Sequence, residues 1–101
     1  MGVDGTYALS AQAGGKTYKG TAHIASHANT VQLSLDAPIL GAVKAQGTLG
    51  PNDTFSVSGK VRVLLKRITY TIEGQVEGDH LSATASTNMG TFRATGVRVE
   101  R

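Results

Sequence analysis

Residues 67–87, RITYTIEGQVEGDHLSATAST, hold two segments in which apolar and polar residues alternate. Because successive side chains of a strand point to opposite faces, a period of two predicts two half-buried strands. Glu77-Gly78-Asp79 lies between them and is typical of a hairpin turn. If the two strands pair, large side chains lie beside small ones on one face, and something must fill the space: Ile68, Tyr70, Ile72 and Val76 beside Leu81, Ala83 and Ala85.

The same alternation runs through the whole chain and predicts an all-β fold with residues 1–101 as one domain. Turn residues interrupt it about every dozen residues and leave eight short strands, and no segment keeps a helical period. Each strand has one apolar face, so an open sheet would leave two edges and no covering layer. We therefore expect a single eight-stranded up-and-down antiparallel β-barrel. A two-sheet β-sandwich is the alternative, although it usually needs longer crossing connections.

Two details of register follow from the pattern. In the last strand, Phe92, Ala94 and Gly96 share one face, whereas Val97 and Val99 follow on the other phase, which predicts a bulge at Gly96. A cluster of basic residues is expected on the outer face, with Arg62 opposite Glu73: Lys44, Lys60, Arg62, Arg67 and, at its edge, Lys66. Nucleic acid is not an expected partner, because the aromatic residues phase inward rather than onto this cluster.

Composition excludes several classes of site. The 101 residues include no cysteine, which excludes disulfides and thiolate metal sites. No apolar run approaches the ~20 residues of a membrane helix, and the predicted outer face is polar, so no membrane span is expected. The net charge of +3 is only mildly basic. The sequence does not determine the cellular compartment, and an exported or periplasmic location is compatible with a removed leader.

Gly5-Thr6-Tyr7 at the start and Thr91-Phe92-Arg93-Ala94-Thr95-Gly96-Val97-Arg98 near the end resemble the calycin pattern of lipocalins and avidins. In that pattern a Gly-x-Trp on the first strand is capped by an arginine from the last strand. The resemblance implies a ligand-binding barrel in which Tyr7 takes the place of the tryptophan and Arg98 or Arg93 caps it. The chain has no tryptophan, so biotin binding as in avidins is not expected.

Catalytic and metal-binding patterns are missing from the sequence. His23 and His27 are four residues apart on one predicted strand, which separates their Cα atoms by about 13 Å, too far for a shared metal. The carboxylates fall in turns or on the outer face, so no acid–base pair is expected. We therefore expect no metal, no cofactor and no enzymatic activity.

The predicted interior holds many small residues: Ala11, Gly20, Ala22, Ala45, Gly47, Gly59, Gly74, Ala83, Ala85, Ala94 and Gly96. Protein cores pack at crystal density, and empty volume is destabilising. Two interpretations remain. Either the barrel is flattened and closed by protein, or a lumen remains for a ligand.

Candidate ligand contacts come from two sets of residues. All five aromatic side chains phase inward, and tyrosine hydroxyls can orient a ligand between apolar walls. Four of the five are candidate contacts: Tyr7, Tyr18, Tyr70 and Phe92. Two connections predicted at one barrel end carry consecutive apolar residues: Ile39 and Leu40 in one, Leu64 and Leu65 in the other. These connections suggest a mouth for a hydrophobic ligand or, through residues 37–40 and 63–65, a homodimer contact.

The leading hypothesis is a non-enzymatic module that binds an apolar or amphipathic small molecule in its lumen. The alternative is a structural barrel with a closed core that self-associates or docks a partner through those apolar loops. A cyclase- or isomerase-like enzyme that uses the interior tyrosines ranks third.

Overall fold

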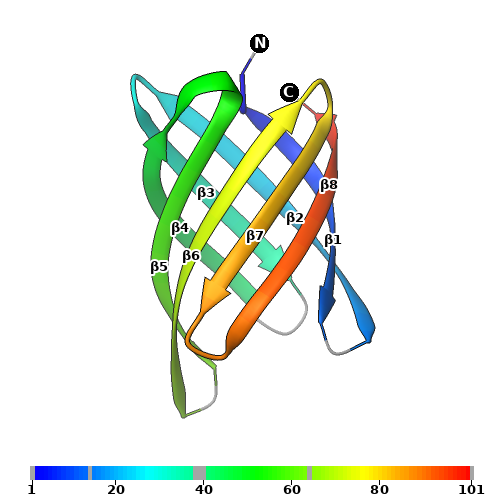
Figure 1. The fold of residues 1–101 in the computed structure, drawn as a ribbon, viewed down its shortest axis with the longest axis vertical. Helices are drawn as coiled ribbons and strands as arrows, with labels where there is room; N and C mark the ends of the chain where they lie inside the picture. The colour runs from blue at the N-terminus through cyan, green and yellow to red at the C-terminus, as the bar shows by residue number, and fades with distance from the viewer. Residues whose placement is uncertain (1, 14, 38–40, 64, 101) are drawn as a thin grey trace.

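The computed structural model describes residues 2–13, 15–37, 41–63 and 65–100, and in it eight antiparallel strands close into a barrel (Figure 1). Each strand pairs with the next, and β1 pairs with β8. The predicted all-β, up-and-down, eight-stranded barrel is confirmed. The elements are β1 (Gly5–Ala13), β2 (Lys16–His27), β3 (Thr30–Ala37), β4 (Gly41–Leu49), the 3-10 turn η1 (Pro51–Asp53), β5 (Thr54–Val63), β6 (Lys66–Glu77), β7 (His80–Thr87) and β8 (Gly90–Glu100).

The barrel is elongated, with extents of 39 × 23 × 20 Å, and its two ends differ (Figure 1). One end, called here the capped end, carries both chain termini and the β2–β3, β4–β5 and β6–β7 connections. The other, called the hairpin end, carries the β1–β2, β3–β4, β5–β6 and β7–β8 connections. As predicted from the strand order, the β3–β4 and β5–β6 connections therefore lie at the same end.

The stretch 67–87 forms the expected hairpin of β6 and β7. Large and small residues face each other across it, with Ile72 opposite Ala85, and Gly78 turns the chain with a φ of 61°. Aromatic rings fill part of the space beside the small residues. A Cβ added at Gly74 would lie 2.8 Å from Cε1 of Phe55, its cross-strand neighbour on β5. Protein atoms therefore occupy the interior at this level of the hairpin.

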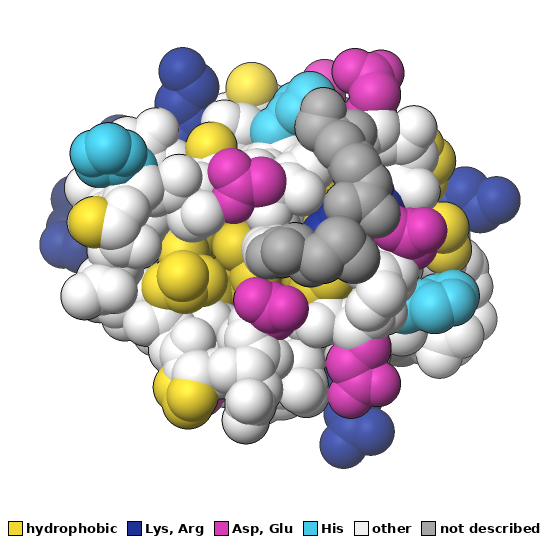
Figure 2. All heavy atoms as spheres, turned by 90° about the horizontal axis from the view of Figure 1, so that it is seen from above, with side chains coloured by type: hydrophobic (Ala, Val, Ile, Leu, Met, Phe, Trp, Pro, Cys, Tyr) yellow, Lys and Arg dark blue, Asp and Glu magenta, His cyan; other side chains and the backbone are white. Residues whose placement is uncertain are grey.

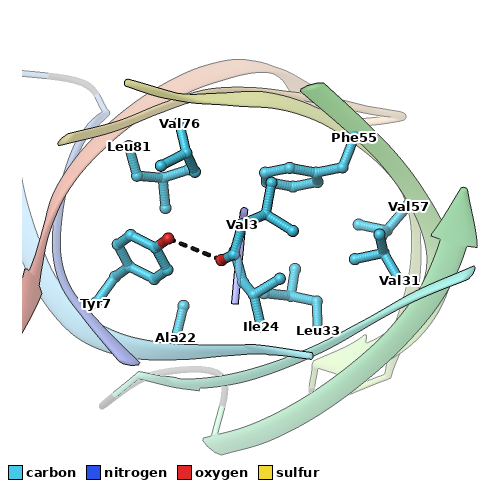
Figure 3. Close-up of a cluster of buried hydrophobic side chains, with 10 residues drawn as sticks. All are labelled: Val3, Tyr7, Ala22, Ile24, Val31, Leu33, Phe55, Val57, Val76 and Leu81. Carbon is cyan, nitrogen blue, oxygen red and sulfur yellow. Dashed lines mark hydrogen bonds between the residues drawn. The ribbon is translucent and has the colours of Figure 1, made fainter. Parts of the chain in front are cut away.

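The packed core lies toward the capped end, and Figure 3 shows its side chains. Its members are buried side chains from six strands and from the residue that precedes β1: Val3, Tyr7, Ala22, Ile24, Val31, Leu33, Phe55, Val57, Val76 and Leu81. Nearer the hairpin end, Val43 and Tyr70 are buried, but most inward-facing residues there are only half-buried: Leu9, Ala11, Leu35, Val61, Ile68, Ala85 and Phe92. The interior is thus closed by protein at one end and accessible toward the other.

The predicted bulge at Gly96 is wrong. Gly96 stays in register with both of its neighbours, and the irregularity lies where Tyr7 faces Arg98 but Thr6 faces Glu100, so that Val99 is the extra residue of β8. Val97 and Val99 lie on the outer face, 48% and 62% exposed. Because β8 keeps its phase, Arg98 points into the barrel. The prediction failed because it took two exposed valines for inward-facing residues.

The predicted pairing of Arg62 with Glu73 is also wrong. Arg62 lies directly opposite Arg67, and Glu73 lies opposite Ser56. The register follows from the short β5–β6 connection, in which Val63 already pairs with Lys66. Two like charges are thus neighbours on the outer face, an arrangement that opposes folding.

Gly47 marks the point of closest approach between β4 and β5. A Cβ added there would collide with the carbonyl oxygen of Ser56 and lie 2.6 Å from Cα of Val57. The two backbones touch because Gly47 has no side chain, and a glycine at such a point lets a sheet bend sharply.

We predict that Gly47→Ala lowers the free energy of unfolding by about 1–3 kcal/mol, because one strand must move to admit the methyl group. Gly2→Ala is the matched control, since nothing lies within 4 Å of its added Cβ. Urea denaturation followed by circular dichroism measures both variants. Equal stability of the two variants would contradict the contact between the strands.

Candidate functional site

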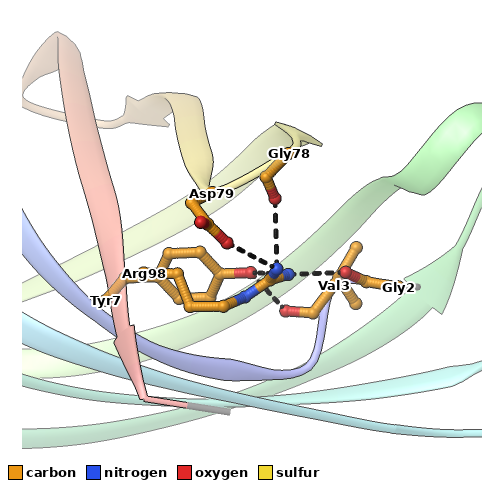
Figure 4. A network of polar contacts seen from close by, with 6 residues as sticks. All are labelled: Gly2, Val3, Tyr7, Gly78, Asp79 and Arg98. Carbon is orange, nitrogen blue, oxygen red and sulfur yellow. Dashed lines mark hydrogen bonds and ion pairs between the residues drawn. The ribbon is translucent and has the colours of Figure 1, made fainter.

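A buried arginine closes the capped end (Figure 4). The Arg98 side chain lies inside the barrel, with its Cζ 5.3 Å from the centroid of the Tyr7 ring. Nη2 donates to the hydroxyl of Tyr7 and to the carbonyl of Gly2, both at 2.7 Å. Nη1 donates to the carbonyl of Gly78 at 3.1 Å and pairs with Oδ1 of Asp79 at 3.2 Å. One guanidinium thus joins the N-terminal segment, β1, β8 and the β6–β7 turn.

Gly5 makes room for this arginine. It has a φ of 147°, and a Cβ there would lie 2.9 Å from Nε of Arg98 and 2.8 Å from the carbonyl oxygen of Glu100. Both the backbone conformation and the space therefore require glycine. The glycine and the aromatic residue of the Gly5-Thr6-Tyr7 motif act together: one admits the guanidinium and the other stacks against it.

The segment that precedes β1 closes the same end. Val3 is 1% exposed and lies at the centre of the barrel cross-section, where its carbonyl accepts a 2.7 Å hydrogen bond from the Tyr7 hydroxyl (Figure 3). The carboxylate of Asp4 accepts hydrogen bonds from the backbone and the hydroxyl of Ser26 on β2. Sequence alternation could not reveal Val3, because it lies outside every strand.

The calycin resemblance left two arginines as candidates for the cap. The structure places Arg98 against Tyr7, whereas Arg93 is exposed on the outer face of β8. Burial raises the pKa of the Tyr7 phenol above 10.0, and the hydrogen bond from Arg98 opposes that rise. Tyr7 thus serves as a neutral donor to Val3 and as an acceptor for Arg98.

Tyr70 presents a different kind of phenol. It is 9% exposed, and its hydroxyl has no hydrogen-bond partner among the described residues. The ring lies over Gly59 on β5, where an added Cβ would come within 2.5 Å of Oη. Burial raises the pKa of Tyr70 above 10.0. Its hydroxyl is therefore a buried donor that is available for a partner.

The predicted ligand contacts are spread along the barrel. Tyr7 lies at the capped end, while Tyr18, 38% exposed, and Phe92 lie toward the hairpin end. Tyr70 shares that half, since β7 pairs with both strands there, Thr87 with Tyr70 and Ala85 with Phe92. Leu65 is 99% exposed, whereas Ile39, Leu40 and Leu64 lie outside the described residues. Contact of any of these residues with a ligand stays a prediction.

Other parts of the described chain show few features of a binding site. A solvent-open groove of about 620 Å³ lies along β4 to β8, lined by polar side chains such as Glu73 and Arg93 and also by Phe55, Ala83 and Ala94. Among the described residues, no three His, Asp or Glu side chains gather closely enough to hold a metal ion. The same residues contain no helix long and apolar enough to cross a bilayer.

Fold and site together define a small eight-stranded antiparallel barrel with one capped end and one accessible half. Two solved structures share this fold. The redesigned β-barrel mFAP0, bound to DFHBI, is 18% identical with a TM-score of 0.76, and the match covers 95% of this chain and 98% of that one. The redesigned β-barrel mFAP1, also bound to DFHBI, is 16% identical with a TM-score of 0.75, covering 95% and 94%. Likeness at these identities shows the fold alone.

No family model matches the chain. No curated protein matches it either.

We predict that Arg98→Met lowers the free energy of unfolding by about 3 kcal/mol, because it leaves buried acceptors without donors. Arg93→Met is the matched control, an exposed arginine on the same strand, and should change stability by less than about 0.5 kcal/mol. Chemical denaturation of the two variants decides the point. Similar losses in both would show that the guanidinium does not hold the capped end.

The two buried phenols predict a loss of stability in alkali. Their pKa values are raised in the folded barrel, so the neutral form is favoured there and the unfolded chain ionises first. Stability should be fully present below about pH 10 and fall as the pH rises further. Tyr70→Phe should reduce the slope of that fall, measured as urea midpoints between about pH 8 and about pH 11. An unchanged slope would contradict the buried state of this phenol.

Proposed function

We propose that this barrel is a non-enzymatic binding module that takes one apolar or amphipathic small molecule into the half of its interior nearer the hairpin end. The observation that carries the proposal is the difference in burial between the two ends. Inward side chains such as Val31 and Val57 are fully buried, whereas Leu35 and Val61 on the same two strands are half-buried. Large apolar side chains that face inward but stay accessible are typical walls of a ligand site.

The distribution of small residues supports the same location. Ala11, Ala85 and Ala94 face inward in this half, so the wall formed by β1, β7 and β8 is thin there. Three large aromatic side chains lie nearby: Phe92 on β8, Tyr70 on β6 and Tyr18 on β2, which is opposite Ala11. A ligand between the thin wall and these aromatic rings would gain apolar contacts that the protein itself does not supply.

The ionisable groups inside the barrel favour binding over catalysis. Arg98 is the charged residue that is buried among the described residues, and its guanidinium is engaged at the capped end. In the accessible half, Tyr70 offers a neutral hydroxyl, which can orient a polar group. Proton transfer would need a second titrating group beside it. The mFAP0 and mFAP1 barrels, which share the fold, were solved with DFHBI bound.

We predict saturable one-to-one binding of an environment-sensitive hydrophobic dye, and DFHBI is a second probe. Ala85→Phe should abolish binding by filling the half-buried interior beside Phe92. Ala25→Phe, at an exposed position of β2, adds the same ring on the outer face and should leave binding intact. Circular dichroism confirms that both variants fold. Binding that both substitutions weaken equally would place the dye on the surface and overturn the proposal.

Self-association through the hairpin end is the second candidate, and two exposed side chains there favour it, Leu65 and Met89. Sedimentation velocity separates the candidates. The absence of saturable dye binding, together with a dimer that Leu65→Asp converts to a monomer, would support the interaction barrel instead.

A further inference from the structure

The wall of the barrel is incomplete between β4 and β5. Their ladder runs only from Leu49 opposite Phe55 to Gln46 opposite Ser58. Both strands continue beyond it toward the hairpin end and stay paired on their other sides, β4 with β3 as far as Gly41 and β5 with β6 as far as Val63. Residues 41–45 and 59–63, all described as strand, thus border an unpaired seam, and the lower parts of β4 and β5 diverge in Figure 1.

The close crossing at Gly47 explains why the seam opens. The backbones of β4 and β5 touch there, next to the last ladder pair, and strands that cross so sharply separate again beyond the crossing. Unpaired backbone N–H and C=O groups on both borders then need other partners. Water or a ligand can supply them, so the seam presents polar backbone groups in the wall of this half of the barrel.

Positive charge lies on both borders of the seam. Lys44 on β4 and Lys60 and Arg62 on β5 are exposed on the outer face, and Arg67 lies beside Arg62. Asp36 on β3 is the nearby acid, opposite Ala42. The adjacent pair Arg62 and Arg67 opposes folding unless an anion offsets its repulsion.

The molecule is polarised from end to end. Acidic side chains gather at the capped end, around an apolar centre (Figure 2): Asp4, Asp53, Glu77, Asp79 and Glu100. Basic ones occupy the hairpin end: Lys16, Lys19, Lys44, Lys60, Arg62, Lys66 and Arg67. The field of such an arrangement attracts anions to the hairpin end and repels them from the capped end.

The interior border of the seam holds the unpartnered phenol. Gly59 is the first β5 residue beyond the ladder, and the Tyr70 hydroxyl lies directly over it. Tyr70 is nine-tenths buried, and its hydroxyl oxygen is buried without a partner among the described residues. A buried donor therefore lies behind an unpaired seam whose outer borders are cationic, which is the arrangement that an anionic acceptor would complete.

We infer that the β4–β5 seam binds the carboxylate head of an anionic amphiphile, whose apolar chain lies in the accessible half of the barrel. The Tyr70 hydroxyl donates to one carboxylate oxygen from inside, while Lys44, Lys60 and Arg62 neutralise the head from outside. The inference rests on the proposed function, because the chain must have a lumen to enter. It adds the class of ligand and the place of its polar head.

The test compares three probes that share one alkyl chain: dodecanoate, dodecan-1-ol and dodecyltrimethylammonium, each used below its micelle concentration in a dye-displacement titration. Dodecanoate should bind at least about tenfold more tightly than the alcohol, and the ammonium probe most weakly. The preference for dodecanoate should shrink as salt is added. Equal affinity for acid and alcohol would overturn the head-group site and leave the lumen standing. Failure of every probe to displace the dye would overturn the proposed function itself.

Two triple variants locate the charge. Lys44→Gln/Lys60→Gln/Arg62→Gln should remove the preference for dodecanoate and keep the affinity for dodecan-1-ol. Lys16→Gln/Lys19→Gln/Arg93→Gln removes the same net charge from β2 and β8 and should keep the preference. An equal loss in both triple variants would show that overall charge, and not the seam, selects the anion.

Tyr70→Phe tests the inner contact. It should weaken dodecanoate about tenfold, since a hydrogen bond to a charged acceptor is lost, and leave the salt dependence unchanged. An unchanged affinity for dodecanoate would exclude the phenol from the site.

Discussion

The capped end depends on one guanidinium held inside a small barrel. Arginine cannot lose its proton in a protein, so a buried Arg98 must find acceptors or destabilise the fold. Its acceptors are the carbonyls of Gly2 and Gly78, the hydroxyl of Tyr7 and the carboxylate of Asp79. These groups come from the chain start, β1 and the β6–β7 turn. Satisfying Nη1 and Nη2 of this side chain therefore fixes the positions of three separate segments, with Val3 in the core beside them, while Nε has no partner among the described residues.

The two ends of the barrel differ in how fully protein side chains fill the interior. Near the cap, protein side chains fill the cross-section, and Phe55 covers the space that Gly74 leaves open. Toward the hairpin end the inward residues become smaller or only half-buried, and the ladder between β4 and β5 stops at Gln46. An accessible interior, an unpaired seam and a cluster of basic side chains thus coincide in one half of the molecule. The packed core and the buried charge lie at one end, and the proposed binding site lies at the other.

Strand number and strand order could be predicted from the sequence because both depend on local signals, alternation and turn residues. The predictions that were wrong, and the features that the sequence did not reveal, depend on contacts between distant segments. Alternation assigns apolar residues to the interior, so the exposed Val97 and Val99 concealed the inward direction of Arg98. Only the resemblance to the calycin pattern pointed to an arginine at that place. The alternation of apolar and polar residues in β4 and β5 continues past their last pair, so no local sequence signal predicts the seam. The seam follows instead from the backbone contact at Gly47.

The position of Arg98 near the end of the chain also has a kinetic meaning. Its partners Tyr7 and Gly2 are 91 and 96 residues away in sequence, and β1 must pair with β8 to close the sheet. Contacts of such separation carry a high entropic cost of loop closure and form slowly. Until the final strand has been synthesised, β1 and β7 remain exposed edges that other chains can pair with. The cap therefore forms late in folding: a chain truncated just before Arg98 lacks the buried charge, although it keeps residues 90–97 of the strand that closes the sheet.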